Sequence, residues 1–279
     1  MIIAIFPNET KKHSTDLAVG ITEFLQGQGV SVVTEDVHAA ALGARALSSV
    51  DPQEIRFLIS MGGDGTILRL AHKYHHLDAA ILGINLGHLG FMADVPLSDI
   101  YPSLQDLMSG SYKVLERVMI QGESANQEKC FAVNDIVVHR AKNPSLIELG
   151  IHVDGIYVNT FEADGIIVAT PNGSTAYSLA AGGPILSPDL DALVITPICA
   201  HTISNRPIVL TAQQEIQIQY LSDYAPVELR ADGLENFSLQ TGDVCKIRVH
   251  PKKFKLVSLN RRDYFSTLRT KLGWAGKLR

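Results

Sequence analysis

A glycine-rich turn with one carboxylate is the most chemically suggestive stretch of the sequence. Gly62–Gly65 reads Gly-Gly-Asp-Gly, follows the apolar run at residues 57–61 and precedes helical spacing. Strand, glycine turn and helix predict a loop whose backbone N–H groups bind phosphate. The loop matches neither Walker A nor G-x-G-x-x-G. A carboxylate there repels phosphate, so Asp64 is interpreted as a proton acceptor or metal ligand, with an ordinary helix N-cap as the alternative.

An adjacent amide and carboxylate form a second candidate group. Asn134 and Asp135 fall within Phe131–His139, an apolar run that predicts a strand. Two polar side chains inside a strand cost free energy unless they meet partners. They suit the hydroxyls of a sugar or the amino group of adenine. The alternative is a β-bulge or an exposed strand end.

A hydroxyl-rich segment, Thr170–Gly183, is the third candidate. A proline ends the preceding strand, and Gly173 provides a turn. Ser174 and Thr175 are then expected to cap a helix that runs to Ala181. A glycine-bounded helix start of this kind is interpreted as a second anion or ribose site, and a capped connector helix is the alternative.

Two further motifs carry weaker signals. His72, His75 and His76 have the i, i+3, i+4 spacing of one helix face, but no carboxylate completes a metal-binding set. That pattern favours a polar helix end. The segment Gly83–Gly90 is a strand that runs into a glycine-rich loop, and it would lie near the Asp64 loop if the two strands are neighbours.

Composition narrows the class of protein. The chain has 279 residues, 46% apolar and 19% charged, with a net charge of −5. These values predict a folded protein and give no electrostatic sign of nucleic-acid or anionic-membrane binding. Cys130, Cys199 and Cys245 lie in separate apolar runs and are interpreted as buried thiols of a reducing compartment. No run of about 18 apolar residues is present, so we expect a cytoplasmic protein.

Strands and helices alternate in the first part of the chain, which predicts a parallel sheet covered on both faces. The expected strands are Ile2–Phe6, Val30–Val33, residues 57–61 and Ala80–Leu86, and the expected helices are Ser14–Gln28, Ala39–Leu47, the helix from the glycine loop to His76, and Ser98–Ser109 with Ser98 as its cap.

After about Val114 the runs are rich in β-branched residues and lack intervening helices, which predicts antiparallel sheets packed as a sandwich. Asp154–Gly155 predicts a tight hairpin turn. Residues 264–272 return to helical spacing. The expected strands are Lys113–Glu123, Phe131–His139, Leu146–Val153, Ile156–Phe161, Gly165–Ala169, Leu193–Thr196, Ile208–Leu210, Ile216–Tyr220, Val227–Arg230, Val244–His250 and Phe254–Leu259.

Taken together, these motifs resemble those of the NAD kinase family of bacterial type. The stretch Thr170–Ser178 is specific to this family, whereas lipid kinases and phosphofructokinases carry loops similar to Gly62–Thr66. Three residues depart from the pattern: Asn172 where Thr or Ser is usual, Glu162 where some members have Arg, and Leu234 where an amide is common. The matching stretches are Gly62–Thr66, Asn85–Phe91, Asn134–Asp135 with Asp in place of the commoner Glu, Asp164–Gly165, Thr170–Ser178, His201–Pro207 and Asp232–Gly233.

The resemblance implies an α/β domain with a parallel sheet formed by residues 1–113 and 262–279, and an all-β sandwich that binds NAD, formed by residues 114–261. A C-terminal segment would return to the first domain. It implies ATP-dependent phosphorylation of NAD at the 2′-hydroxyl of its adenosine ribose, giving NADP. A divalent cation, expected to be Mg²⁺, would accompany ATP without a dedicated set of protein ligands. The enzyme would be a homo-oligomer, either a dimer or a tetramer.

The residues and the resemblance together assign roles. Asp64 would accept the proton of the 2′-hydroxyl. A lipid kinase is the alternative enzyme, and a non-catalytic dinucleotide-binding regulator, which would have no use for Asp64, is the alternative outside catalysis. The expected phosphate-binding residues are Gly62, Gly63, Gly65 and Thr66, and the expected NAD-binding residues are Asp64, Gly65, Asn134, Asp135, Asp164, Thr175, Ala176, Tyr177, Ser178, Leu179 and Ala180.

Overall fold

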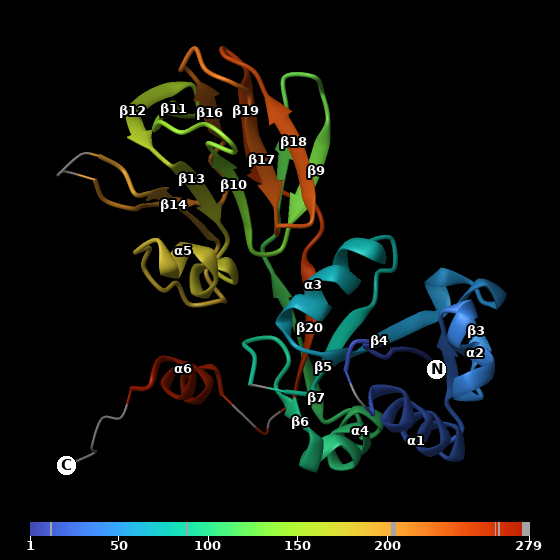
Figure 1. The fold of residues 1–279 in the computed structure, drawn as a ribbon. Helices are drawn as coiled ribbons and strands as arrows, with labels where there is room; N and C mark the ends of the chain where they lie inside the picture. The colour runs from blue at the N-terminus through green and yellow to red at the C-terminus, as the bar shows by residue number, and fades with distance from the viewer. Residues whose placement is uncertain (12, 88, 202–204, 260, 262, 275–279) are drawn as a thin grey trace, which may run out of the picture. The chain divides into compact units, whose positions relative to one another are not determined.

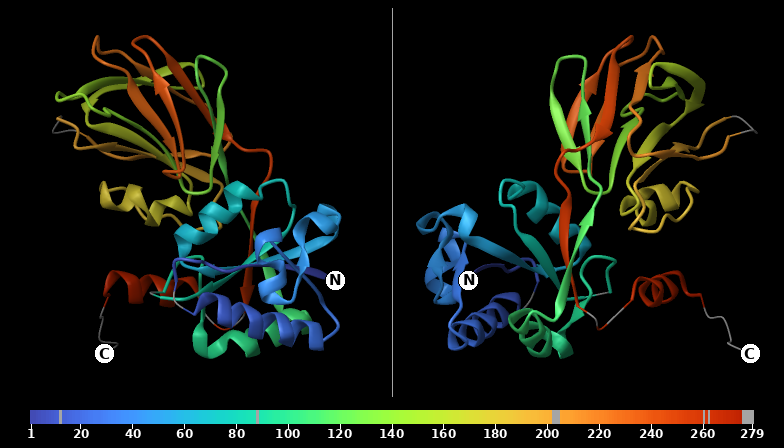
Figure 2. Two further views of the ribbon diagram at one scale, coloured as in Figure 1. Left: turned by 45° about the vertical axis from the view of Figure 1, so that its right-hand side comes forward. Right: turned by 180° about the vertical axis from the view of Figure 1, so that it is seen from behind.

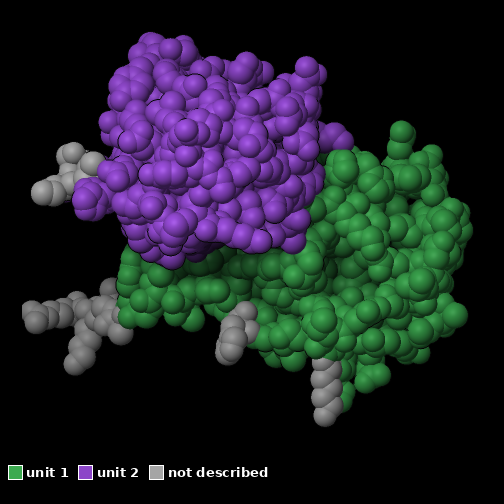
Figure 3. Space-filling model, turned by 45° about the horizontal axis from the view of Figure 1, so that its top comes forward, with its two compact units in different colours: residues 1–116, 255–279 green, residues 117–254 purple. Residues whose placement is uncertain are grey.

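The computed structural model of the protein describes residues 1–279 apart from 12, 88, 202–204, 260, 262 and 275–279. The described chain divides into two compact units, residues 1–116 with 255–279 and residues 117–254 (Figure 3). His88 and residues 202–204, which belong to two of the family-like stretches, lie outside the described residues.

Unit 1 is built on a parallel sheet, as predicted. The strand order is β3-β2-β1-β4-β5-β20-β7, with β6 paired to β5. The registered pairs in this sheet are parallel. The strands are β1 (Ile2–Phe6), β2 (Ser31–Thr34), β3 (Arg45–Ala46), β4 (Ile55–Gly62), β5 (Ala80–Asn85), β6 (Val95–Pro96), β7 (Tyr112–Arg117) and β20 (Phe254–Leu259).

Helices cover both faces of this sheet (Figures 1 and 2). One apolar core joins α1 (Ser14–Gly27), α2 (Asp36–Leu42) and α4 (Ile100–Ser109) to the strands, and α3 (Asp64–Lys73) lies on the opposite face. The C-terminal helix α6 (Tyr264–Leu272) belongs to unit 1, as expected. Its residue Tyr264 packs against Phe91, with ring centroids 6.2 Å apart. Short 3₁₀ turns, η1 (Leu47–Ser49), η2 (Pro52–Glu54) and η3 (Leu97–Asp99), complete the unit.

Three helix predictions for unit 1 need correction. The helix α2 ends at Leu42, followed by Gly43 at φ 61°, so the predicted extension to Leu47 is wrong. Ser98 lies inside η3 and does not cap α4. Because α3 ends at Lys73, two of the three clustered histidines lie beyond its end and the cluster shares no helix face.

Unit 2 is a β-sandwich of two six-stranded antiparallel sheets, with orders β15-β14-β13-β10-β17-β18 and β12-β11-β16-β19-β8-β9. Apolar side chains from both sheets interdigitate in one core. The elements are β8 (Ile120–Glu123), β9 (Lys129–Ala132), β10 (Asp135–His139), β11 (Ile147–Val153), β12 (Ile156–Ala163), β13 (Gly165–Ala169), η4 (Gly173–Thr175), α5 (Tyr177–Ala180), β14 (Ala192–Ile198), β15 (Ile208–Thr211), β16 (Ile216–Tyr220), β17 (Val227–Ala231), β18 (Glu235–Leu239) and β19 (Val244–Val249).

The hairpin prediction is confirmed, because Asp154 and Gly155 join β11 to β12 with φ values of 51° and 78°. The prediction for the cysteines is correct only for Cys130 and Cys245, which are buried in the sandwich core. Cys199 is exposed.

Two strands join a different sheet from the one predicted. Residues 113–123 form two strands, β7 in the sheet of unit 1 and β8 in the sandwich. Likewise β20, expected within 114–261, pairs with β5 through Leu256 and Ile81. The physical reason is that alternation of side chains marks a strand without specifying its partner.

No helix in the described part of the chain is long and apolar enough to cross a membrane.

Candidate active site

The glycine loop lies at the carboxyl end of β4, where parallel sheets bind ligands. Gly62 ends the strand, and a Cβ there would lie 2.3 Å from Thr66 Oγ1, so no side chain fits without displacing the loop. Gly63 precedes α3 and Asp64 is its first residue, with no side-chain cap. The N-cap alternative for Asp64 is therefore wrong. The N–H groups of Gly63 and Gly65 donate to no described residue.

The Asp64 carboxylate is held by the backbone of the next glycine-rich loop. Its Oδ2 accepts the N–H of Phe91 at 2.8 Å, and its Oδ1 accepts those of Met92 and Ala93 at 3.0 and 2.9 Å. A Cβ on Gly90 would lie 2.0 Å from Oδ1, so only glycine lets this loop come so close. Since an ionised carboxylate offers about four acceptor positions, Oδ2 retains capacity for one more donor.

Neighbouring strands complete this loop region. Gly62 pairs with Asn85 across β4 and β5, which confirms that the two glycine-rich loops are neighbours. The N–H of Thr66 donates to Gly63 O at 2.9 Å, so it is not available to a phosphate in this conformation. The Thr66 hydroxyl accepts from Asn8 Nδ2 at 3.1 Å. Sequence reasoning missed Asn8, although a polar residue just after β1 was a signal because parallel strands end at one edge.

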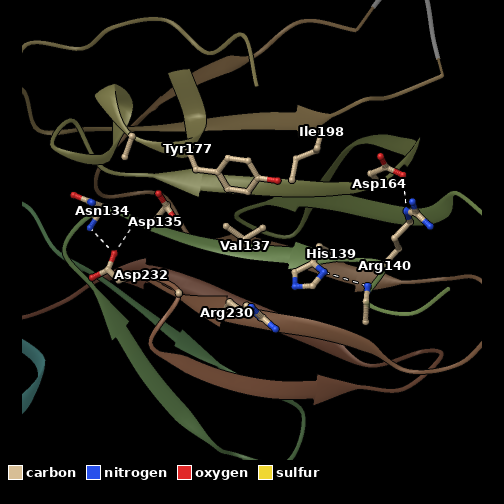
Figure 4. A pocket seen from close by; sticks show the side chains of 13 residues that line it. Asn134, Asp135, Val137, His139, Arg140, Asp164, Tyr177, Ile198, Arg230 and Asp232 are labelled. Carbon is tan, nitrogen blue, oxygen red and sulfur yellow. Dashed lines mark hydrogen bonds and ion pairs between the residues drawn. The ribbon is translucent and has the colours of Figure 1, made fainter. Parts of the chain in front are cut away.

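A second set of predicted residues lines a pocket of about 580 Å³ on unit 2. Its floor is the outer face of the sheet that contains β10, opposite the sandwich core. In Figure 4, Asn134, Asp135 and Asp232 lie at one end, Arg140 and Asp164 at the other, and Tyr177 above the floor. The lining residues are Asn134, Asp135, Val137, His139, Arg140, Ala141, Asp164, Ala176, Tyr177, Ile198, Arg230, Asp232 and Gly233.

Several floor residues were not predicted. Asp135, Val137 and His139 are alternate residues of β10 and share a face, a period-two signal that the sequence did contain. Arg230 lies beside Val137 on the adjacent strand β17. That pairing joins residues far apart in sequence, so no local pattern indicates it.

The turn before β10 is organised by Asp232. Its Oδ2 accepts the N–H of Val133 at 2.7 Å, and its Oδ1 accepts those of Asn134 and Asp135 at 2.8 and 3.1 Å. In return the N–H of Asp232 donates to Asp135 O at 2.9 Å. The prediction of one strand over residues 131–139 is wrong, because β9 and β10 belong to different sheets and the chain crosses between them here.

Asp135 is a buried carboxyl group with an altered affinity for protons. Burial raises its pKa to about 7, and the nearby negative charge of Asp232 adds to the effect. Near neutral pH this carboxyl group therefore exists in both protonation states. It can donate as well as accept a hydrogen bond from a ligand.

The far end of the pocket holds paired charges. Arg140 Nε lies 2.7 Å from Asp164 Oδ1. The Nδ1 of His139 accepts the N–H of Ala141 at 3.1 Å, so a neutral ring carries its proton on Nε2, which lies 3.4 Å from Glu228 Oε2. Burial lowers the pKa of His139, which favours this neutral form.

The hydroxyl-rich segment differs from its prediction. The expected helix is split into η4 and the four-residue α5, with Ala176 between them at φ −103° and ψ −124°. The Ser174 hydroxyl donates to Pro171 O and accepts from Leu186 N, and that of Thr175 donates to Asn172 O, so neither caps a helix.

Only part of this segment reaches the pocket. Ala176 and Tyr177 line it. Ser178 is buried, its hydroxyl bonds Thr196 Oγ1 at 2.9 Å, and it does not line the pocket. Leu179 and Ala180 are absent from the lining of the pocket.

The unpaired N–H groups of the glycine loop suit a phosphate, and the polar pocket of the sandwich suits a small polar ligand, which are the two requirements of a nucleotide-dependent phosphotransferase. Residues 3–112 match the family model of the ATP-NAD kinase N-terminal domain, and residues 133–259 match that of the C-terminal domain. The chain belongs to the NAD kinase family. It catalyses ATP-dependent phosphorylation of NAD at the 2′-hydroxyl of the adenosine ribose, giving NADP.

Two bacterial NAD kinases are similar in sequence to this chain over nearly its full length. The NAD kinase of Protochlamydia amoebophila is 56% identical over 278 residues, covering 100% of both chains. That of Moorella thermoacetica is 38% identical, covering 98% of this chain and 90% of the relative. Among solved structures, yeast NADH kinase complexed with NADH is similar with a TM-score of 0.88, 26% identity and coverage of 100% and 89%. An NAD kinase from Archaeoglobus fulgidus in complex with ATP has a TM-score of 0.78, 25% identity and coverage of 99% and 100%.

Proposed function

We propose that the loop Gly62–Thr66 binds the phosphates of ATP through the N–H groups of Gly63 and Gly65, and that the pocket on unit 2 binds NAD. The free N–H groups at the start of α3 support the first assignment. The convergence of amide, carboxyl and guanidinium groups on one pocket supports the second.

Asp64 accepts the proton of the attacking hydroxyl in this proposal. The ribose 2′-oxygen forms a bond to the γ-phosphorus, the bond from that phosphorus to the β,γ-bridging oxygen breaks, and ADP leaves with the electron pair. The hydroxyl proton goes to Asp64 Oδ2, the oxygen with spare acceptor capacity. The hydrogen bonds from Phe91, Met92 and Ala93 orient the carboxylate for this role, and they are the observation that carries the assignment.

The donor set suits a cation that arrives with ATP. Among the described residues no group of three His, Cys, Asp or Glu side chains gathers at one point. Mg²⁺ typically keeps several waters and binds largely through substrate phosphates, so the phosphates of ATP would hold it here. When bound, Mg²⁺ supplies neutralisation of the negative charge on the phosphates.

NAD recognition divides along the pocket. Asn134 and Asp135 at one end would hydrogen-bond hydroxyl or amino groups, and Asp164, oriented by Arg140, would do so at the other. Tyr177, which is 47% exposed, offers a ring for stacking. Ala176 and Tyr177 would contact NAD directly. Thr175, Ser178, Leu179 and Ala180 would contribute indirectly, by fixing the conformation of the segment that carries those two residues.

The exposed edge of unit 2 supports the proposal of a homo-oligomer. β12 is an edge strand, and its residues Ile156, Tyr157 and Val158 are 72%, 58% and 39% exposed. It contains no Lys or Pro, the residues that usually block edge pairing. Sedimentation of Val158→Lys beside the native chain tests this, and an unchanged mass would count against the edge as an interface. The free thiols support a reducing, cytoplasmic compartment.

The assay incubates the protein with NAD, ATP and Mg²⁺ and offers the product to an NADP-requiring dehydrogenase. We expect the dehydrogenase to reduce the product, because the product is NADP. Calorimetry with NAD alone, on the native chain and on Asp64→Asn, then tests whether Asp64 acts in catalysis while the pocket on unit 2 binds NAD. An Asp64→Asn chain that turns over normally would refute the role of Asp64.

A further inference from the structure

The side chain of Asn134 is held from behind by another asparagine. Asn172 Nδ2 donates to Asn134 Oδ1 at 2.7 Å, and Asn172 is 9% exposed. The backbone is fixed at the same place, since the N–H of Thr170 donates to Asn134 O at 2.9 Å. A Cβ on Gly173 would lie 2.1 Å from that oxygen, so the turn can approach only because residue 173 is glycine.

The orientation of both amides follows from a group that can only donate. Arg117 Nη1 lies 3.5 Å from Asn172 Oδ1, and Arg117 is buried with 7% exposure. A guanidinium has five N–H donors and no acceptor, so the oxygen of Asn172 must face it. The NH₂ of Asn172 is then left for Asn134, which must meet it with its own oxygen.

The consequence is a defined polarity at the pocket wall. Asn134 lines the pocket, and its Nδ2 donates to no other described residue. With Oδ1 engaged, the side chain can offer a ligand only N–H donors. A reversed Asn134 would set two NH₂ groups against each other, which the chain Arg117–Asn172–Asn134 prevents.

We infer that Asn172 is a positioning residue that makes Asn134 present its NH₂ group to the pocket, so that the site reads a hydrogen-bond acceptor of NAD at this point. The acceptor is a ring nitrogen, a carbonyl oxygen or a hydroxyl oxygen. The inference rests on the proposed function only in taking NAD as the ligand. A hydroxyl side chain at position 172 both donates and accepts, so it would not impose this polarity.

Asn172→Asp reverses the polarity without changing shape. The new carboxylate accepts only, so Arg117 still donates to it, and Asn134 must turn its NH₂ toward it and its oxygen toward the ligand. NAD affinity measured by calorimetry should fall on the order of 10- to 100-fold, the effect of an acceptor facing an acceptor. Asn172→Ala removes the constraint and leaves both orientations open, so the affinity should fall only about two- to fivefold.

Stability should rank the two variants in the opposite order. Asn172→Asp keeps an acceptor for Arg117 Nη1 and gives it a negative charge, whereas Asn172→Ala removes that acceptor from beside a buried guanidinium and should have the lower melting temperature. Asn126→Asp, in the exposed turn before β9, makes the same change of charge away from the pocket and should bind NAD normally. Asn134→Asp keeps the bond from Asn172, removes the donor and adds a negative charge at the pocket wall, so it should lose at least as much affinity as Asn172→Asp.

NAD affinity of Asn172→Asp equal to that of Asn172→Ala would overturn the inference. So would losses of affinity that simply follow the losses of melting temperature, because that is the behaviour of a structural residue. Failure of the native chain to bind NAD would refute the proposed function itself, and the comparison between variants keeps the two failures distinct.

Discussion

Replacement of Asp232 by asparagine tests whether one carboxylate organises the NAD pocket. The native carboxylate accepts three backbone N–H groups, from Val133, Asn134 and Asp135, at 2.7 to 3.1 Å. An amide retains one oxygen, so one of the three N–H groups must face an NH₂ group. The other two hydrogen bonds lose their charge.

The expected cost follows from these three bonds. A buried donor left unpaired costs about 1–3 kcal/mol, and a hydrogen bond that loses its charge loses about 1 kcal/mol. Removal of the Asp232 charge also removes its electrostatic repulsion of an ionised Asp135, and this offsets part of the loss of stability. We therefore expect Asp232→Asn to lower the free energy of unfolding of unit 2 by about 3–5 kcal/mol at pH 6, where Asp135 is mostly protonated and the offset is small.

Amide hydrogen exchange followed by mass spectrometry is the assay, because it reports on residues 133–135 directly. Asp154→Asn is a matched control: Asp154 also precedes a glycine in a left-handed turn, at φ 51° against 50° for Asp232. Among the described residues its exposed carboxylate accepts one backbone N–H, that of Glu215. The control should cost less than about 1 kcal/mol. Native exchange rates at residues 133–135 in Asp232→Asn would refute the reasoning.

Three other changes give separate tests. Asp64→Asn should lower kcat about 10²–10⁴-fold, with little change in NAD affinity, because the proton acceptor is lost; steady-state kinetics and calorimetry check this. Gly90→Ala should reduce kcat as well, since its Cβ would lie 2.0 Å from Asp64 Oδ1, whereas Gly27→Ala has nothing within 4 Å and should be neutral in the same assay. Asp135→Asn should melt above the native chain at pH 8, because the raised pKa means that ionising Asp135 costs folding energy. The native chain loses this stability, at most about 4 kcal/mol, as the pH rises from about 4 to about 7, so melting curves of the two proteins should converge below about pH 4.

The sequence predicted features that depend on neighbouring residues. The glycine loop after β4, the Asp154–Gly155 hairpin and the parallel sheet follow from local turn chemistry and from the periodicity of apolar residues. These signals lie within a few residues of the element that they specify.

Features that depend on distant pairing were not predictable. The crossover at Asn134 is held by Asp232, 98 residues away in the sequence, so the polar pair was placed inside a strand. The N–H of Thr66 donates a hydrogen bond to Gly63 O, and this bond depends on the conformation of the turn, which the sequence does not specify. Arg230 enters the pocket through the register of β17 against β10, and alternation alone does not fix register.

The position of β20 constrains how the chain folds. This strand, formed by residues 254–259, lies between β5 and β7, so the sheet of unit 1 has a gap until the end of the chain is available. During synthesis from the N-terminus, residues 117–253, nearly all of unit 2, leave the ribosome before that strand does. The sandwich can therefore complete its own core first. Until β20 is available, β5 and β7 have unpaired edges, which are prone to aggregation. Closure of the first sheet is expected to be a late, slow step, because it joins Leu256 to Ile81 across most of the chain.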